Sequence, residues 1–183
     1  MKPAMFFDRD GTLNEAVGYV NHASRFKLYP WAVDAVRLAG EEGYLAVLTT
    51  NQSAVGRGYI TEELLSSIHS GLSETLEVAG AKLDGIYHCP HLPSESCACR
   101  KPKPGMLVRA AEELDIDLAS SWMIGDNFSD LQAGWAAGTR AAMVKTGSGE
   151  GALEQESARW DKQPDLIADN VHQAVCDICW GPR

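Results

Sequence analysis

Two carboxylates, Asp8 and Asp10, stand one residue apart directly after the apolar run Ala4 to Phe7. Repulsion between the ions makes that arrangement costly unless a cation or a proton relieves it. A carboxylate at the end of a strand can act as a nucleophile and form an aspartyl phosphate. A second carboxylate can protonate the leaving oxygen and then take a proton from the water that hydrolyses the intermediate. We therefore expect Asp8 to attack phosphorus and Asp10 to act as general acid and base.

Other polar residues could complete a phosphoryl-transfer site around this pair. Asp126 supplies a third carboxylate, and hard oxygen ligands with open water positions suit Mg²⁺, which would offset the repulsion between Asp8 and a phosphate. Thr50 and the backbone amides beside it could hold phosphate oxygens. The Lys101 ammonium would offset charge that develops on the phosphoryl group. Asp, Asn, Gly and Thr are also common in turns, so each motif taken alone is equally compatible with a solvated loop.

The pattern of apolar residues predicts the elements that would position these groups. Strands are expected at 4–7, 45–49, 84–88, 122–124 and 141–144, and helices over 30–42, 61–79, 105–114, 129–137 and 170–180. Strands that alternate with helices indicate an α/β fold with a mostly parallel sheet. Residues 147–163 are rich in Gly, Glu, Gln and Ser, and we expect an exposed linker or loose loop there.

Polar clusters follow three of these strands. They are Asp8-Arg9-Asp10, Thr50-Asn51-Gln52-Ser53 and Gly125-Asp126-Asn127. Ligands of a parallel sheet bind beyond the carboxyl ends of its strands, so we expect the three clusters to converge. Convergence favours one shared site over three unrelated turns. Asp130, one helical turn after Asp126, is expected to orient Lys101 or the metal site.

The segment HCPHLPSESCACRKPKPG, residues 88–105, holds a second cluster with the pattern C-x-H-x5-C-x-C. Its members are Cys89, His91, Cys97 and Cys99. Four such ligands in a short loop match a closed, structural zinc site, which would hold together a loop too small for a core. A disulfide or unrelated thiols are the alternatives, and a reducing compartment disfavours the disulfide. Arg100 and Lys101 follow the last ligand, so a stiff loop would aim two cations at the phosphate site.

Length, composition and charge limit the kind of protein. A chain of 183 residues with 45% hydrophobic and 22% charged residues is typical of one globular domain, with a core over about 4–147 and an extension over about 148–183. The net charge of −9 argues against nucleic acid as a partner. The apolar runs are too short for a membrane span or a signal peptide, so we expect a cytoplasmic monomer with no membrane partner. The pair Cys176 and Cys179 lacks nearby partner ligands, and we expect partly buried small side chains there.

The segments FFDRDGT, TTNQS, RKPKPG and GDNFSD together resemble the four motifs of the haloacid dehalogenase superfamily of phosphohydrolases, over about residues 4–147. The resemblance implies a Rossmann-like fold with helices on both faces, a minimal cap or none, Mg²⁺ dependence and a phospho-aspartate intermediate. It also implies that Asp8, Asp126 and the main-chain oxygen of Asp10 bind the metal. Thr50 and Lys101 would hold the phosphoryl group.

The zinc loop narrows the resemblance to the histidinol-phosphatase-like group, which includes heptose-bisphosphate phosphatases. The implied reaction is removal of the 7-phosphate of D-glycero-D-manno-heptose 1,7-bisphosphate, with histidinol phosphate or another small phosphate ester as the alternative substrate. The residues that the resemblance implies near the substrate are Gly18, Tyr19, Asn51, Gln52, Ser53, Arg100 and Asn127. Asn127 stands where the heptose enzymes often have Lys, which leaves the exact sugar phosphate open.

Two further functions are alternatives. A phosphotransferase or mutase usually needs a cap domain to exclude water, and the segments between the motifs are too short for a large one. A zinc-loop interaction module without catalysis predicts that Asp8→Asn changes no activity.

Overall fold

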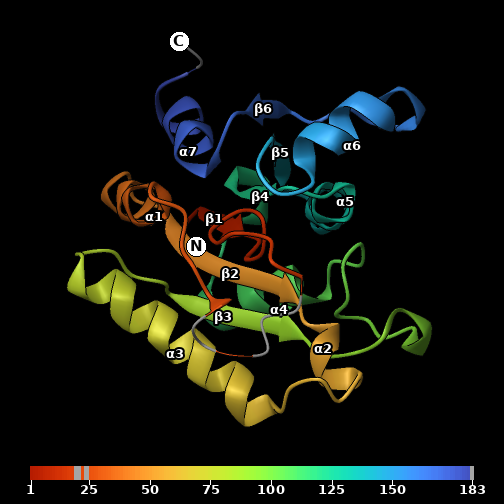
Figure 1. The fold of residues 1–183 in the computed structure, drawn as a ribbon. Helices are drawn as coiled ribbons and strands as arrows, with labels where there is room; N and C mark the ends of the chain where they lie inside the picture. The colour runs from red at the N-terminus through yellow and green to blue at the C-terminus, as the bar shows by residue number, and fades with distance from the viewer. Residues whose placement is uncertain (19–21, 23–24, 182–183) are drawn as a thin grey trace.

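The fold is built on one parallel sheet. The structure, a computed structural model, describes residues 1–18, 22 and 25–181. The strands are β1 (Ala4–Phe7), β2 (Leu45–Asn51), β3 (Gly85–Cys89), β4 (Trp122–Gly125), β5 (Arg140–Val144) and β6 (Leu166–Ala168). They form a six-stranded sheet in the order β3-β2-β1-β4-β5-β6 (Figure 1). Each neighbouring pair runs parallel, with Phe7 beside Leu48 and Ile124, which confirms the predicted α/β class.

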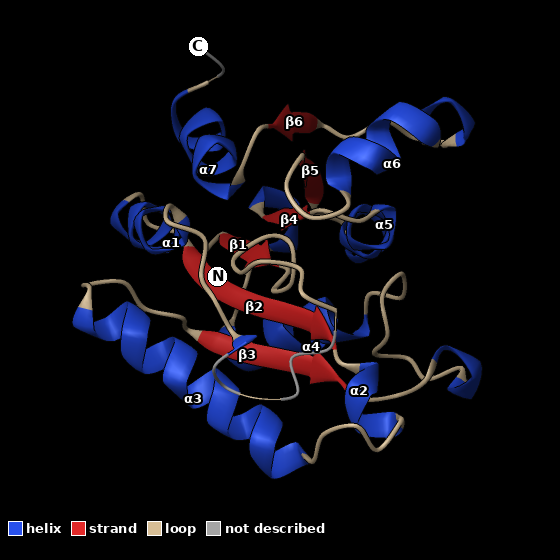
Figure 2. Ribbon diagram, viewed as in Figure 1, coloured by secondary structure: helices blue, strands red, loops and turns tan. Residues whose placement is uncertain are grey.

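Helices cover both faces of this sheet, as Figure 2 shows. The helices are α1 (Ala32–Glu41), α2 (Ser53–Gly56), α3 (Glu62–Val78), α4 (Gly105–Leu114), α5 (Phe128–Ala137), α6 (Gly149–Gln155) and α7 (Val171–Trp180), with short 3₁₀ turns η2 (Pro93–Glu95), η3 (Leu118–Ser120) and η4 (Ser157–Arg159). The predicted helices correspond to α1, α3, α4, α5 and α7. None of the described helices is long and apolar enough to cross a lipid bilayer.

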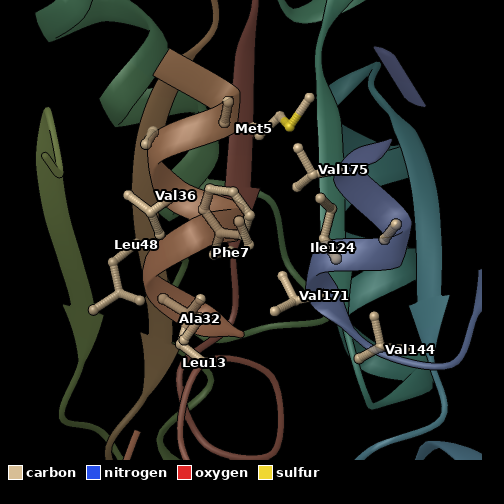
Figure 3. Packing of buried hydrophobic residues seen from close by; sticks show 14 of the residues in the cluster. Met5, Phe7, Leu13, Ala32, Val36, Leu48, Ile124, Val144, Val171 and Val175 are labelled. Atoms are coloured by element: carbon tan, nitrogen blue, oxygen red, sulfur yellow. The ribbon is translucent and has the colours of Figure 1, made fainter. Parts of the chain in front are cut away.

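Alternation along β1 divides the core between the two faces, because successive strand side chains point in opposite directions. Met5 and Phe7 pack with α1, α7 and the C-terminal half of α3, a cluster seen from close by in Figure 3. Phe6 points to the other face, where it packs with Met106 and Leu107 of α4. Since β1 is buried on both faces, its side chains are all apolar until Asp8, and the first polar group appears where the strand ends.

Helix ends are set by side chains that satisfy free backbone groups. Thr61 Oγ1 accepts a hydrogen bond from the Leu64 amide at 3.2 Å and starts α3, as the sequence predicts. Asn127 accepts one from the Ser129 amide at 3.0 Å and starts α5. Gly138, with φ +95°, ends α5 in the left-handed conformation that glycine adopts without strain.

The prediction of a loose loop over 147–163 is wrong. Residues 149–155 form α6, and η4 follows. Leu153 and Trp160 pack against Leu131 and Met143, so this segment is anchored on the sheet. Its apolar residues are too few for a helical period to be visible among the glycines. Strand β6, which has three residues, was not predicted.

Candidate active site

The carboxyl ends of β2, β1 and β4 lie side by side, and the predicted convergence of polar clusters is confirmed there. They line a cavity of about 450 Å³. Its lining residues are Asp8, Asp10, Thr50, Asn51, Arg100, Lys101, Asp126, Asn127, Ser129, Asp130 and Ser148. The cavity therefore collects residues from five separate stretches of the chain, one of which is the end of the cysteine loop.

Lys101 lies at the centre of this cavity. Its Nζ is 2.6 Å from Asp8 Oδ1 and 2.6 Å from Asp130 Oδ1, and it donates to the Thr49 carbonyl oxygen at 2.8 Å. These three partners use all three ammonium hydrogens. Burial alone would lower the pKa of Lys101, but the charges of Asp130 and Asp8 outweigh it and raise that pKa above its ordinary value. Lys101 is therefore a fixed positive charge beside Asp8, and the predicted orienting contact of Asp130 is confirmed.

The buried carboxylates of the cavity fit a divalent cation. Asp8, Asp126 and Asp130 are buried and offer oxygens that lie within 4.8 Å of one another. Burial raises the pKa of Asp8 well above its ordinary value and that of Asp126 to about 6. Three buried carboxylates around one ammonium leave negative charge uncompensated, which a hard cation with oxygen ligands would offset. Asp130 already bonds Lys101 and the Asn127 amide, so Asp8 and Asp126 are the carboxylates best placed to hold Mg²⁺.

Ser148 and two glycines surround the carboxylate of Asp126 and fix its position. The Ser148 amide and hydroxyl donate to Asp126 Oδ2 at 2.8 and 3.0 Å. Gly11 and Gly147 have φ values of +89° and +58°, and a Cβ at either would lie 2.3 or 2.2 Å from the same oxygen. Both positions therefore need glycine for conformation and for space. Ser148 was missed in the sequence because it lies in the segment predicted to be a loose loop.

Asp10 points into a cluster of N–H donors beside the cavity. Arg9 donates from Nη2 at 2.8 Å, Asn14 from Nδ2 at 2.9 Å and Gln52 from Nε2 at 2.8 Å. Gln52 Nε2 also donates to Thr50 Oγ1 at 2.9 Å. This amide therefore ties the predicted acid/base residue to the predicted phosphate-binding hydroxyl.

Other predicted substrate-binding residues take different places. Asn51 lines the cavity, but its amide side chain donates to the Lys101 carbonyl and accepts from the Lys101 amide, both at 3.1 Å. Arg100 and Asn127 line the cavity. Gly18 is exposed and Ser53 begins α2, and neither is among the cavity-lining residues. Tyr19 lies outside the described residues.

The cysteine loop brings the four predicted ligands together. Cys89, Cys97 and Cys99 have Sγ atoms 3.2 to 3.5 Å apart, and His91 Nδ1 is 3.3 Å from Cys99 Sγ. These cysteines are free thiols, so the disulfide alternative is not supported. Four ligand atoms grouped this closely, three of them sulfur, fit a tetrahedral zinc ion with no open position. The loop is joined to the cavity wall, because the Gln52 amide donates to the Cys89 carbonyl at 2.7 Å.

Substitution of a loop ligand should release zinc and loosen the cavity wall. In Cys99→Ser we expect zinc content to fall from one equivalent to near zero. Unfolding should occur at a temperature lower by about 4–8 °C, the equivalent of roughly 2 kcal/mol for a chain of this size. Elemental analysis and calorimetry measure both, and Cys176→Ser on α7 is the matched control. Unchanged zinc content in Cys99→Ser would contradict the assignment.

The sheet is parallel in this strand order, an aspartate pair follows its first strand, and a lysine lies beside that pair. Together these features define a hydrolase of the haloacid dehalogenase type. The HAD-hydrolase-like family matches residues 98–174. Among solved structures, D,D-heptose 1,7-bisphosphate phosphatase from B. bronchiseptica, complexed with magnesium and phosphate, superposes with a TM-score of 0.87 at 31% identity and covers 94% of this chain and 96% of its own. The enzyme from Burkholderia thailandensis superposes with a TM-score of 0.72 at 27% identity, covering 96% and 97%.

Curated relatives narrow the class further. D-glycero-beta-D-manno-heptose-1,7-bisphosphate 7-phosphatase of Yersinia pestis is 45% identical over 167 residues, covering 86% of this chain and 88% of the relative. The enzyme of the same name from Haemophilus influenzae is 43% identical over 188 residues, covering 97% and 95%. The chain therefore belongs to the heptose-bisphosphate phosphatase family of HAD-like hydrolases, and it is a phosphatase.

Proposed function

We propose that this protein removes the 7-phosphate from D-glycero-D-manno-heptose 1,7-bisphosphate through a phosphorylated Asp8. The observation that carries the proposal is the position of Asp8, which directly follows β1, lies beside the Lys101 ammonium and lines the same cavity as Asp126. Relatives of 40–45% identity that bear this activity in their names support the choice of substrate.

In the first step, Asp8 attacks phosphorus with Oδ2 while Lys101 holds Oδ1. Asp10 gives a proton to the sugar oxygen that leaves, because an alkoxide is too poor a leaving group to depart alone. The Lys101 ammonium offsets charge on the phosphoryl oxygens. Thr50 Oγ1 already accepts a hydrogen bond from Gln52, so its own hydrogen is available to a phosphoryl oxygen.

In the second step, Asp10 takes a proton from water that attacks phosphorus. The bond between phosphorus and the Asp8 oxygen breaks, so inorganic phosphate leaves and Asp8 is again a carboxylate. When bound at Asp8, Asp126 and the main-chain oxygen of Asp10, Mg²⁺ supplies the positive charge that lets an anionic ester approach an anionic nucleophile. Zinc has no part in either step. We assign it to holding Arg100 and Lys101 in place.

Substrate recognition is assigned to the rim of the cavity. Arg100 donates from Nη1 to the His91 carbonyl at 3.2 Å, which holds the guanidinium where it can meet an anionic substrate. Asn127 uses its oxygen to cap α5, so its amide N–H groups are left for a sugar hydroxyl. Gly18, Tyr19 and Ser53 are proposed as sugar contacts from the resemblance of their motifs alone, while Asn51 and Gln52 act through Lys101 and Asp10.

We also infer that residues 1–183 work as a single phosphatase domain, because β6 and α7 extend the same sheet and core as residues 4–147. A cytoplasmic location suits the proposed thiolate zinc ligands, which need a reducing compartment. We propose a monomer without nucleic-acid or membrane partners, and light scattering after gel filtration checks the oligomeric state.

A panel of phosphate esters at fixed Mg²⁺ tests the substrate. We expect kcat/KM for heptose 1,7-bisphosphate to exceed that for histidinol phosphate by roughly 100-fold, because a site built for sugar hydroxyls and a second phosphate leaves polar groups unpaired with the amino alcohol. Asp8→Asn run on the same panel is the control for contaminating phosphatases. Preference for histidinol phosphate would overturn the assignment of substrate without changing the class.

A further inference from the structure

Arg9 stands between the two catalytic aspartates in the sequence but points away from the cavity. It is 1% exposed, and a guanidinium cannot lose its charge in a protein. A buried charge of this kind is costly unless other groups pair with it. Nε and Nη2 donate to the Asp10 carboxylate at distances from 2.8 to 3.2 Å. The guanidinium also lies over the Phe26 ring, 5.8 Å from its centre.

The third guanidinium nitrogen, Nη1, lies 3.2 Å from Nε2 of His69 on α3. Arginine has donors only, so this contact is a hydrogen bond only if His69 Nε2 lacks a proton and accepts. His69 is buried, with 6% of the residue exposed. Burial, followed by the charge of Arg9 and the neighbouring His88, lowers the pKa of His69 to about 3. The ring is therefore neutral at physiological pH, and a hydrogen bond from Arg9 to Nε2 requires the ring hydrogen to lie on Nδ1.

We propose that His69 is a positioning residue for Asp10 and acts through Arg9. Its unprotonated Nε2 fixes one end of the guanidinium, and the other end then holds the carboxylate between Asn14 and Gln52. Asp10 must present one oxygen to the leaving group and later to water, and a small misplacement of a catalytic group lowers the rate strongly. The inference rests on the acid/base role proposed for Asp10 and does not depend on which ester is the substrate.

Leaving-group dependence tests the proposal. A sugar phosphate needs a general acid, whereas p-nitrophenyl phosphate releases a stable anion without one. If another alkyl phosphate, such as histidinol phosphate, proves to be the better substrate, it takes the place of the sugar phosphate, so an error in the proposed substrate leaves the test intact. We expect His69→Leu to lower kcat/KM about 10–100-fold for the sugar phosphate and less than about threefold for p-nitrophenyl phosphate.

Two further variants separate positioning from packing. His69→Gln keeps an acceptor for Arg9, and we expect it to stay within about threefold of the unaltered protein on both esters. His88→Gln removes the neighbouring ring, which bonds Glu62 rather than Arg9, and should behave in the same way. Equal losses of kcat/KM on both esters in a folded His69→Leu protein would overturn the proposal. A loss of kcat/KM in His69→Gln as large as that in His69→Leu would overturn it too.

A measurement on the unaltered protein covers the case in which His69→Leu does not fold. Nitrogen-15 NMR of the imidazole distinguishes protonated from unprotonated ring nitrogens. We expect Nε2 of His69 to be unprotonated at neutral pH. A protonated Nε2 would rule out the bond to Arg9 and with it the proposal.

Discussion

Asp8→Asn should abolish turnover while the fold survives. An amide oxygen is not a competent nucleophile, so we expect kcat to fall by at least about 10⁴-fold on every ester. Stability should not fall with it. Burial raises the pKa of Asp8 and two more carboxylates lie nearby, so loss of this charge relieves repulsion, and Lys101 keeps its contact with Asp130.

Steady-state kinetics with calorimetry on the same sample measure both parts of this prediction. The matched control is Asp34→Asn, an exposed aspartate on α1 paired with Arg37, which should retain full activity. The mass of the Asp8→Asn protein should be checked for deamidation, since reversion to aspartate restores activity. Residual turnover above about 1% in a protein of the correct mass is far more than loss of a covalent nucleophile permits. It would favour a mechanism without aspartyl phosphate.

Lys101→Met should lower both activity and stability. The ammonium lies 2.6 Å from two buried carboxylates, and its removal leaves them uncompensated, which costs about 3–5 kcal/mol. Without a positive charge near the phosphoryl oxygens we expect kcat to fall by about 10³-fold. Lys101→Arg should restore little, because a planar fork cannot reproduce three contacts made by one nitrogen.

A double variant separates the two effects of Lys101. Lys101→Met with Asp130→Asn removes one unpaired charge, so we expect it to recover part of the lost stability and none of the activity. Denaturant unfolding and kinetics measure this, with Lys82→Met at the opposite end of the sheet as the control. Near-normal activity in Lys101→Met would show that charge stabilisation comes from another group.

The sequence predicted the centre of the site better than its surroundings. Asp8, Asp126 and the cysteine loop follow apolar runs whose strand character is visible locally, and parallel strand ends must meet. Contacts between distant segments have no local pattern, which is why the Arg9–His69 pair and Ser148 beside Asp126 were not predicted as parts of the site. Asn51 and Gln52 were predicted near the substrate from their motif, but their side chains hold Lys101 and Asp10. A motif predicts which residues lie near the site, but tertiary packing decides which groups their amide side chains contact.

The proposed covalent step can be observed directly in a crystal structure with Mg²⁺ and beryllium fluoride, which mimics a phosphoryl group bound to a carboxylate. We predict that beryllium is attached to the carboxylate of Asp8, within reach of Lys101 and Thr50, with the metal beside Asp126. A beryllium fluoride adduct on Asp10, Asp126 or Asp130 instead would contradict the mechanism. An Asp8 side chain turned away from the occupied cavity would contradict it too.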